Sequence, residues 1–390
     1  YLLNSTCLKA ESLRFKDTDL FDITKKLLVP FKNSLKFYQE HIINYHSKYG
    51  TRYTERESDN PTDCWIKSRM VSLKNQLINS FESFNLNKAT NHFFKMVDDL
   101  NNWYIKFNRS RIKCLFGKEE ADKSLTTLRQ CLKHISVLIA PFCPYFAEYL
   151  YQRVERDKDY LVGNGIANES VNEAINVADS SVDYLYNSVH LYQWQYLEVF
   201  NFDKDLERQF SLLQTTCDMI RKDRGKYKLN MRRPISKVMI YSNNLEKIND
   251  LRKVEQYLKD EMKIFNIRFK LIPDLMVRTY KFNYPKYGRT MGKFAKRIMS
   301  RFSGGHFENG YKFQYKSFTV VVGEHIITEY RMNSAYNYTH NKGVAINLDT
   351  DETELVKKMY WRNLVSNHIQ QFRKEMGLHM WNEILVYFQT

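Results

Sequence analysis

Lysine and arginine side chains gather beside aromatic residues in the first third of the chain. Trp103, Tyr104 and Phe107 stand within residues 101–118, a stretch without acids. Its five bases are Lys106, Arg109, Arg111, Lys113 and Lys118. A guanidinium group binds phosphate through two parallel hydrogen bonds, and aromatic rings stack on unpaired bases. The stretch therefore has the residue types that bind a nucleic acid.

Two further basic stretches follow in the second half of the chain. Residues 281–316 hold nine bases against the single acid Glu308, and Tyr280, Tyr284 and Tyr287 lie at their start. Residues 221–237 hold one acid, Asp223, and eight bases: Arg221, Lys222, Arg224, Lys226, Lys228, Arg232, Arg233 and Lys237.

The whole chain carries the same signature, with a net charge of +16 and 15% aromatic residues among 390. A basic, aromatic-rich protein is typical of a polyanion binder, and nucleic acid is the commonest polyanion. One basic cluster alone is as well explained by a solvated surface, but three favour a binding role. For Trp103, packing in a core and stacking on a base both remain open.

Catalytic and metal-binding patterns are not found in the sequence. The chain has only 13 glycines and contains no glycine-rich phosphate loop, His-Glu-x-x-His or nucleophile elbow. Asp98 and Asp99 are adjacent, so on a helix their carboxylates diverge by ~100° and read as a solvated face. None of the six cysteines forms a Cys-x-x-Cys pair. We therefore expect no catalytic residue, no metal ligand and no cofactor within this chain.

The apolar residues in the first half of the chain recur with the period of an α-helix. Apolar residues recur every three or four positions within residues 28–42, 70–84, 93–107 and 125–139. Such amphipathic helices bury their stripes by packing together, which predicts a helical bundle over residues 1–154. Thr62 or Asp63 is expected to cap the helix that follows Pro61, and Pro141 and Pro144 to interrupt another.

The composition changes after the bundle. Residues 155–183 hold seven acids and two bases among Gly, Asn and Ser, which predicts a surface insertion over 155–187. Helices and strands then alternate, which predicts an α/β (α+β) region in two parts, 188–280 and a basic 281–390. The overall class is mainly α. Strands are expected at 237–241, 267–271, 318–322, 325–331, 343–348 and 384–388, and helices at 206–220, 245–262, 290–302 and 354–376.

Membrane and secretion signals are not visible. The longest apolar run, 135–142, is broken by Ser136 and Pro141 and falls short of the ~20 residues of a membrane span. Residues 1–9 lack the apolar region of a signal peptide. We expect a cytoplasmic protein without a membrane partner.

Several motifs follow one another along the chain, beginning with Asp63-Cys64-Trp65-Ile66. This segment is similar to the Asp-x-Trp-Ile segment that opens the anticodon-binding bundle of class I isoleucyl-tRNA synthetases, of the eukaryote-like type. Residues 101–111 (NNWYIKFNRSR) resemble the Asn-Trp-Tyr-Ile-Arg signature, and residues 139–148 (IAPFCPYFAE) the Ala-Pro-Phe-x-Pro segment. Ser188-Val189-His190 precedes a tryptophan, Trp194, as it does in the family.

The resemblance extends beyond the bundle and covers nearly the whole chain. Residues 1–15, Arg232-Arg233-Pro234, Gly292-Lys293 and residues 369–378 are similar to the opening and junction segments of the same family. The bundle motifs alone also fit valyl- or leucyl-tRNA synthetases. A stand-alone RNA-binding scaffold protein is an alternative from another class.

The resemblance implies the C-terminal, tRNA-binding portion of an isoleucine–tRNA ligase. It implies tRNA as the partner, isoleucine tRNA in particular, together with upstream catalytic and editing domains and, in eukaryote-like enzymes, multi-synthetase assemblies. ATP and magnesium would belong to the catalytic domain of the parent. The candidate tRNA contacts are Trp103, Lys106, Arg109, Arg111, Lys113, Arg221, Arg224, Arg232, Arg233, Lys293, Lys296 and Arg297.

Neither His-x-Gly-His nor Lys-Met-Ser-Lys-Ser, the two nucleotide-binding motifs of class I synthetases, occurs in the chain. We therefore predict that the purified chain shows no isoleucine-dependent exchange between ATP and pyrophosphate. Exchange above the level of a buffer control would show that a catalytic site has been overlooked.

Overall fold

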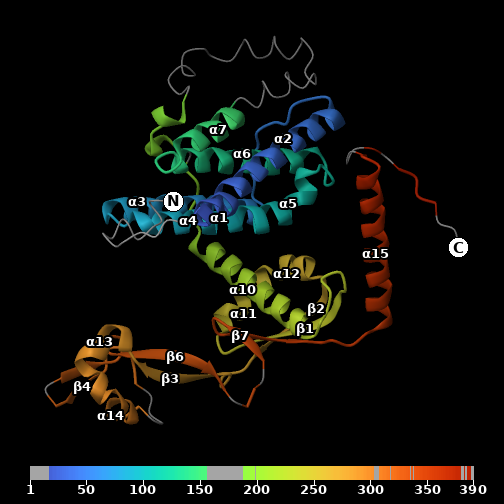
Figure 1. The fold of residues 1–390 in the computed structure, drawn as a ribbon. Coiled ribbons are helices and arrows are strands. Elements are labelled where there is room, and N and C mark those ends of the chain that lie inside the picture. The colour runs from blue at the N-terminus through green and yellow to red at the C-terminus, as the bar shows by residue number, and fades with distance from the viewer. Residues whose placement is uncertain are drawn as a thin grey trace. The chain divides into compact units, whose positions relative to one another are not determined.

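The structure, a computed structural model, describes residues 17–155 and 188–378, except for 198, 303–306, 317, 334 and 337. It also describes residues 382 and 384–387. The chain divides into two compact units (Figure 1). The first is Tyr1–Glu207 with Gly377–Thr390, and the second is Arg208–Met376. Of the expected insertion at 155–187, only Glu155 lies within the described residues.

The first unit is a helical bundle, as expected from the apolar stripes. Two π-helical turns, Thr24–Leu28 and Asp99–Tyr104, join α1 to α2 and α4 to α5 without a break. Short 3₁₀ turns at Val189–Leu191 and Trp194–Tyr196 follow the bundle. Its helices are α1 (Asp17–Ile23), α2 (Val29–Tyr49), α3 (Pro61–Glu82), α4 (Leu86–Asp98), α5 (Ile105–Ile112), α6 (Lys118–Ile139) and α7 (Pro144–Glu155).

The ends of two helices show how proline shapes the bundle. The side chain of Asn60 accepts a hydrogen bond from the amide of Thr62 (2.9 Å), and Pro61 takes the first helical position of α3. The prediction of Thr62 or Asp63 as the cap is therefore wrong, because Asn60 already satisfies the free amide. The prediction of an interruption is confirmed, since α6 ends at Ile139 and α7 begins at Pro144.

The centre of the bundle contains a charged cluster rather than only apolar side chains. Asp63 is fully buried, and its carboxylate accepts hydrogen bonds from Tyr104 Oη (2.8 Å) and Arg111 Nη2 (2.8 Å). Arg111 also donates to Asn108 Oδ1 (2.6 Å) and to Glu120 Oε2 (2.7 Å). The cluster joins the start of α3 to α5 and to the first turn of α6.

The second unit contains a four-stranded sheet with the order β2-β1-β8-β7. Its strands are β1 (Ile235–Ser242), β2 (Ile264–Leu271), β7 (Thr339–Asn341) and β8 (Val344–Leu348). The chain passes from β1 through α11 (Leu245–Lys253) and α12 (Glu255–Met262) into the parallel β2, while β8 runs antiparallel to β1. This arrangement confirms an α/β region after a mainly α part.

A smaller module extends from the sheet between β2 and β7 (Figure 1). A long antiparallel pair, β3 (Met276–Phe282) and β6 (Ile326–Met332), carries it. Its apolar core includes Phe282, Ile298, Val320 and Ile326. The remaining elements are α13 (Tyr284–Met291), α14 (Ala295–Ser300), β4 (Lys312–Tyr315) and β5 (Phe318–Val321).

Long helices begin and end the second unit, and several elements differ from the expected ones; β3, β4, β7 and α13 were not expected. The long helices are α10 (Lys204–Lys226), which starts at the end of the first unit, and α15 (Glu354–Glu375). The helix expected at 245–262 is divided at Val254 into α11 and α12. The strand expected at 384–388 is wrong for the described residues 384–387, whose side chains Leu385 and Tyr387 are 84% and 88% exposed.

We predict that Arg111→Ala lowers the free energy of unfolding of the bundle by about 3–5 kcal/mol, because it leaves the carboxylate of Asp63 buried without its cation. Arg109→Ala, two residues away on the exposed side of α5, is the control and should change stability by less than about 0.5 kcal/mol. Urea unfolding followed by tryptophan fluorescence measures both, since Trp65 and Trp103 lie in the bundle core. Equal stability of the two variants would contradict the structural role of Arg111.

Candidate nucleic-acid interface

The α5 helix sorts its basic residues onto two faces. Lys106 and Arg109 are exposed and Lys113, just after the helix, is half-buried; they are spaced by three and four residues and lie on the outer face. Asn108 and Arg111 lie on the inner face and are buried. We call Lys106, Arg109 and Lys113 the α5 surface. It presents cationic groups that can meet a phosphate backbone.

A pair of stacked rings on α2 supports the α5 surface. The guanidinium carbon of Arg109 lies 5.9 Å from the ring centroid of Phe37, and that ring stacks on His41 at 4.1 Å. Partial burial, with the nearby charge of Arg109, lowers the pKa of Lys113. An anion bound at this surface would relieve the repulsion between these two cations.

The turn between α5 and α6 exposes two apolar side chains that sequence reasoning missed. Leu115 and Phe116 are each 67% exposed. The turn is tight, with φ of +59° at Cys114 and +95° at Gly117, and Lys48 Nζ holds the carbonyl of Cys114 at 2.7 Å. The missed signal was an apolar pair before a glycine, between two helices. A ring held this way beside lysines can stack on an unpaired base.

Two candidates in the first cluster need correction. All three nitrogens of the Arg111 guanidinium donate to protein groups, so this arginine is not available for a phosphate. Trp103 is 3% exposed, and its ring nitrogen lies 3.2 Å from Asp98 Oδ2. Of the two readings left open for Trp103, the structure supports core packing. The physical reason is the phase of the continuous helical segment formed by the π-helical turn Asp99–Tyr104 and α5, which turns Trp103 and Arg111 inward.

Arg224, in the second cluster, also needs correction. Its side chain is 1% exposed and donates to the carbonyls of Asn230, Arg233 and Met262, at 3.1, 2.8 and 2.6 Å. Burial, with the nearby charge of Arg233, lowers its pKa to about 10. Arg224 thus holds the turn between α10 and β1 together instead of facing a ligand.

The other three candidates of the second cluster are not equivalent. Arg221 is ion-paired with Asp218 (2.8 Å) and Glu261 (2.6 Å). Arg233 donates weakly to the carbonyl of Thr350 (3.3 Å) and lies 3.8 Å from Glu352. Arg232 is exposed. Arg232 is therefore the candidate of this cluster that is best placed for a polyanion.

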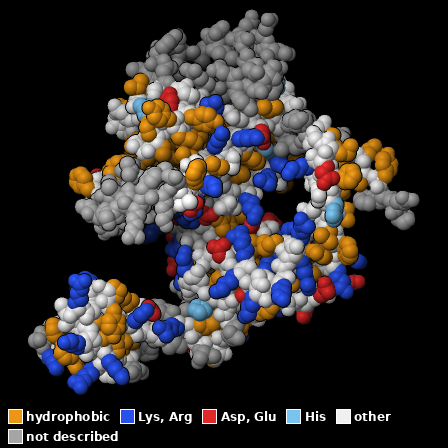
Figure 2. Space-filling model, in the orientation of Figure 1, with side chains coloured by type: hydrophobic (Ala, Val, Ile, Leu, Met, Phe, Trp, Pro, Cys, Tyr) orange, Lys and Arg blue, Asp and Glu red, His pale blue; other side chains and the backbone are white. Residues whose placement is uncertain are grey.

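The third cluster lies on the small module and is exposed as expected. Lys293, Lys296 and Arg297 project outward from the turn before α14 and from α14 itself, while Ala295 and Ile298 face the module core. Residues 276–332 contain eleven bases and three acids. Figure 2 shows Lys and Arg side chains spread over this module, at the lower left. Its phosphate-binding potential rests on this excess of positive charge.

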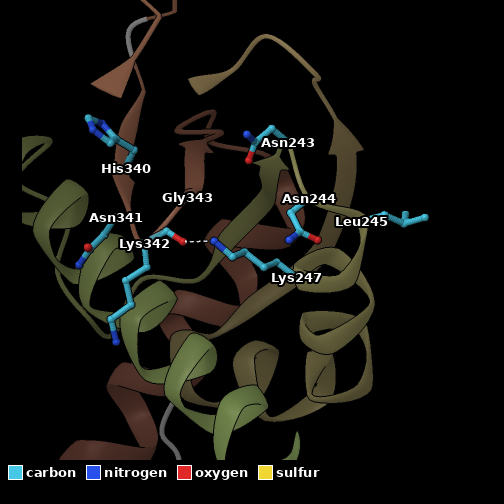
Figure 3. Close-up of a pocket in the computed structure, with 8 residues that line it drawn as sticks. All are labelled: Asn243, Asn244, Leu245, Lys247, His340, Asn341, Lys342 and Gly343. Carbon is cyan, nitrogen blue, oxygen red and sulfur yellow. Dashed lines mark hydrogen bonds between the residues drawn. The ribbon is translucent and has the colours of Figure 1, made fainter. Parts of the chain in front are cut away.

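A polar groove of about 940 Å³ lies where β1 meets α11 and the β7–β8 turn (Figure 3). One of its cations is already used, because Lys247 Nζ donates to the carbonyl of Lys342 (2.6 Å). The groove is lined by Asn243, Asn244, Leu245, Lys247, His340, Asn341, Lys342 and Gly343.

Metal sites and membrane-spanning helices are both absent from the described residues. No group of three or more His, Cys, Asp or Glu side chains there is arranged to hold a metal ion. Among the helices of that same part of the chain, none combines the length and apolarity needed to cross a membrane.

The part of the chain from α3 to β1 matches a known class. Residues 63–240 match the family described as the anticodon-binding domain of tRNA ligase. This part of the chain is thus an anticodon-binding domain of the tRNA-ligase type. The match begins at Asp63, the buried carboxylate that pairs with Arg111.

Over its whole length the chain is a homologue of isoleucine–tRNA ligases. It is 26% identical to the cytoplasmic isoleucine–tRNA ligase of Mus musculus over 427 residues, which covers 100% of this chain and 31% of the relative. For the cytoplasmic enzyme of Saccharomyces cerevisiae the identity is also 26%, with 100% and 36% covered. For the enzyme of Chlamydia trachomatis serovar A it is 28%, with 99% and 35% covered.

The chain thus spans about a third of the length of the relatives it matches. The resemblance to isoleucyl-tRNA synthetases is confirmed by these matches. The alternatives, a valyl- or leucyl-type enzyme or a stand-alone scaffold protein, are not favoured by them.

We predict that His41, behind the α5 surface, makes stability depend on pH. Burial lowers its pKa from 6.5 to about 4, with Lys113 and Arg109 adding to the effect. As the pH falls, His41 binds a proton in the unfolded chain at a higher pH than in the folded chain. The stability that neutral His41 contributes is therefore complete above pH 6.5 and is lost as the pH falls toward 4. Between pH 7 and pH 5 the free energy of unfolding should fall by about 2 kcal/mol more in the unmodified chain than in His41→Gln.

Urea titrations at the two pH values make this comparison, and the variant removes the background from other groups. An identical pH dependence in both proteins would contradict a neutral, buried His41.

Proposed function

We propose that this chain is the tRNA-binding part of an isoleucine–tRNA ligase and that it holds the anticodon arm of isoleucine tRNA. One observation carries the proposal: a domain of the anticodon-binding class presents the exposed cations of its α5 surface. The neighbouring Arg111 is buried and bonds to protein groups instead. An aromatic side chain, Phe116, is exposed next to this surface. Cations and a free ring together suit an RNA loop, whose phosphates and unpaired bases are both accessible.

In this proposal the chain contributes binding energy and position, not chemistry. Holding the anticodon arm fixes the distant acceptor end relative to a catalytic domain of the same protein, which lowers the entropy cost of the reaction there. The exposed cations of the small module, Lys293, Lys296 and Arg297, and Arg232 of the second cluster would contact the backbone. Arg221 and Arg233 would contribute less, because they already have protein partners.

The parent protein, in the same proposal, attaches isoleucine to tRNA with ATP and magnesium bound outside this chain. The likeness to two enzymes described as cytoplasmic supports a cytoplasmic location. The proposal includes association with other synthetases, on the basis of the resemblance to eukaryote-like enzymes.

The double variant Lys106→Ala/Arg109→Ala tests the proposal. We predict that it weakens binding of isoleucine tRNA and lowers the slope of log affinity against log salt by about 1.4 to 1.8, as expected for two lost phosphate contacts. Filter-binding titrations at several salt concentrations measure both quantities. The control is Lys25→Ala/Lys26→Ala, which removes the same charge from exposed positions before α2.

Comparing two tRNAs separates recognition of the base sequence from general attraction to the phosphate backbone. Loss of the α5 surface should also reduce discrimination between isoleucine tRNA and another tRNA, whereas Lys293→Ala/Lys296→Ala/Arg297→Ala should weaken both about equally. If the unmodified chain binds neither tRNA at low salt, the proposed function is wrong. If it binds but the α5 variant behaves like the control, the anticodon arm is held elsewhere.

A further inference from the structure

Among the described residues, no helix packs on one face of the four-stranded sheet of the second unit. The register sets the sides: Lys237 pairs with Asn266, Met239 with Arg268, and Tyr241 with Lys270 across β1 and β2. The alternate residues Val238 and Ile240 are fully buried and face α11 and α12. On β8, Asn347 lies opposite Met239 and so belongs to the same open face as Met239.

The central part of this face is exposed and positively charged. Asn266, Arg268, Lys270 and Asn347 are exposed, and Lys237 and Met239 are half-buried. We call these six residues the sheet surface. It carries three cations and no carboxylate. Two acids border it: Asp349, whose amide donates to the carbonyl of Lys237 (3.0 Å), follows β8 opposite Lys237, and Asp274 accepts a hydrogen bond from Tyr336 Oη (3.1 Å) at the other end.

A stack of tyrosine rings closes one end of the sheet surface. Tyr241 and Tyr338 lie with ring centroids 4.6 Å apart and planes 11° apart, and Tyr338 stacks on Tyr336 at 5.9 Å and 19°. Tyr241 is buried under this stack, whereas Tyr338 and Tyr336 are half-buried. One end of the open face is therefore formed by stacked aromatic rings, next to the cations and amides of the sheet surface.

We infer that the sheet surface is a second RNA site, which binds unpaired nucleotides across β1, β2 and β8. The inference rests on the proposed function and adds to it a place where single-stranded RNA lies. Lys237, Arg268 and Lys270 contact phosphates, and the amides of Asn266 and Asn347 can donate to and accept from base edges. A four-stranded sheet with one open face is an established platform for unpaired bases.

The composition of the surface decides between RNA and a protein partner. Met239 is its one apolar side chain, so docking a helix or strand there would bury little apolar area. Arg268 and Lys270 would instead lose their hydration without a matching acid. A flexible polyanion avoids this cost, because it brings a phosphate to each cation.

The triple variant Lys237→Ala/Arg268→Ala/Lys270→Ala tests the inference. The matched control is Arg252→Ala/Lys253→Ala/Lys259→Ala, which removes three cations from α11 and α12, on the other side of the same sheet. The probes are a 17-nucleotide stem-loop with the anticodon-arm sequence of isoleucine tRNA and a blunt RNA duplex of equal length. Circular dichroism and thermal unfolding check that both variants fold.

We expect the sheet variant to bind the stem-loop about 100-fold more weakly than the control variant at 0.1 M salt. Three contacts at ~0.7 each lower the salt slope by ~2, and 0.1 M lies one decade below a 1 M reference. Duplex binding should fall by no more than it does in the control. Ultraviolet cross-linking of the stem-loop to the unmodified chain should label peptides from β1 or β2.

Three results would overturn the inference. In the first, sheet and control variants bind the stem-loop equally while the α5 variant is impaired; the proposed function then stands and the sheet site fails. In the second, the sheet variant loses duplex and stem-loop binding alike, which means general attraction. In the third, the unmodified chain does not bind the stem-loop, and both proposals fail. If the triple variant does not fold, Arg268→Gln with Lys270→Gln replaces it and should still lower stem-loop affinity at least tenfold.

Discussion

The buried pairing of Asp63 with Arg111 is the constraint on which the bundle depends. A carboxylate removed from water is stable only when cations and hydrogen-bond donors surround it. Here the donors come from Ser58, Tyr104 and Arg111, and because Arg111 lies on α5, α3 and α5 must meet at one point. Glu120 on the other side of Arg111 then fixes the first turn of α6. Apolar stripes alone would let these helices slide along one another, whereas the charged cluster specifies one register.

The same constraint arranges the candidate interface. When Arg111 points inward, the helical period turns Lys106 and Arg109 outward and places Lys113 at the end of the same face. The helix therefore separates one structural arginine, Arg111, from the exposed cations Lys106 and Arg109. Arg224 repeats the pattern in the second unit, where a buried guanidinium holds three carbonyls and leaves Arg232 exposed.

Sequence patterns predicted the bundle, the α/β region and the basic character of the third cluster, because periodicity and composition report burial and charge. They did not predict which arginine of a cluster faces inward. The stripe through Leu100 and Tyr104 pointed to Phe107, yet Asn108 and Arg111 are the buried positions. The π-helical turn at Asp99–Tyr104 lengthens the repeat and shifts the phase of α5, a local change that carries no signal in composition.

The sheet surface was out of reach of sequence reasoning for a different reason. Lys237 was counted with the arginines of the second cluster, since it follows them in the chain, whereas Arg268 and Lys270 belong to no cluster. Strand pairing brings these three cations together from positions about 30 residues apart, and only the register shows that they share a face. Clusters along a chain mark where charge is abundant, while the pairing of strands decides where it can act together. For this chain, the segments richest in lysine and arginine are therefore not the same as the surfaces best suited to RNA.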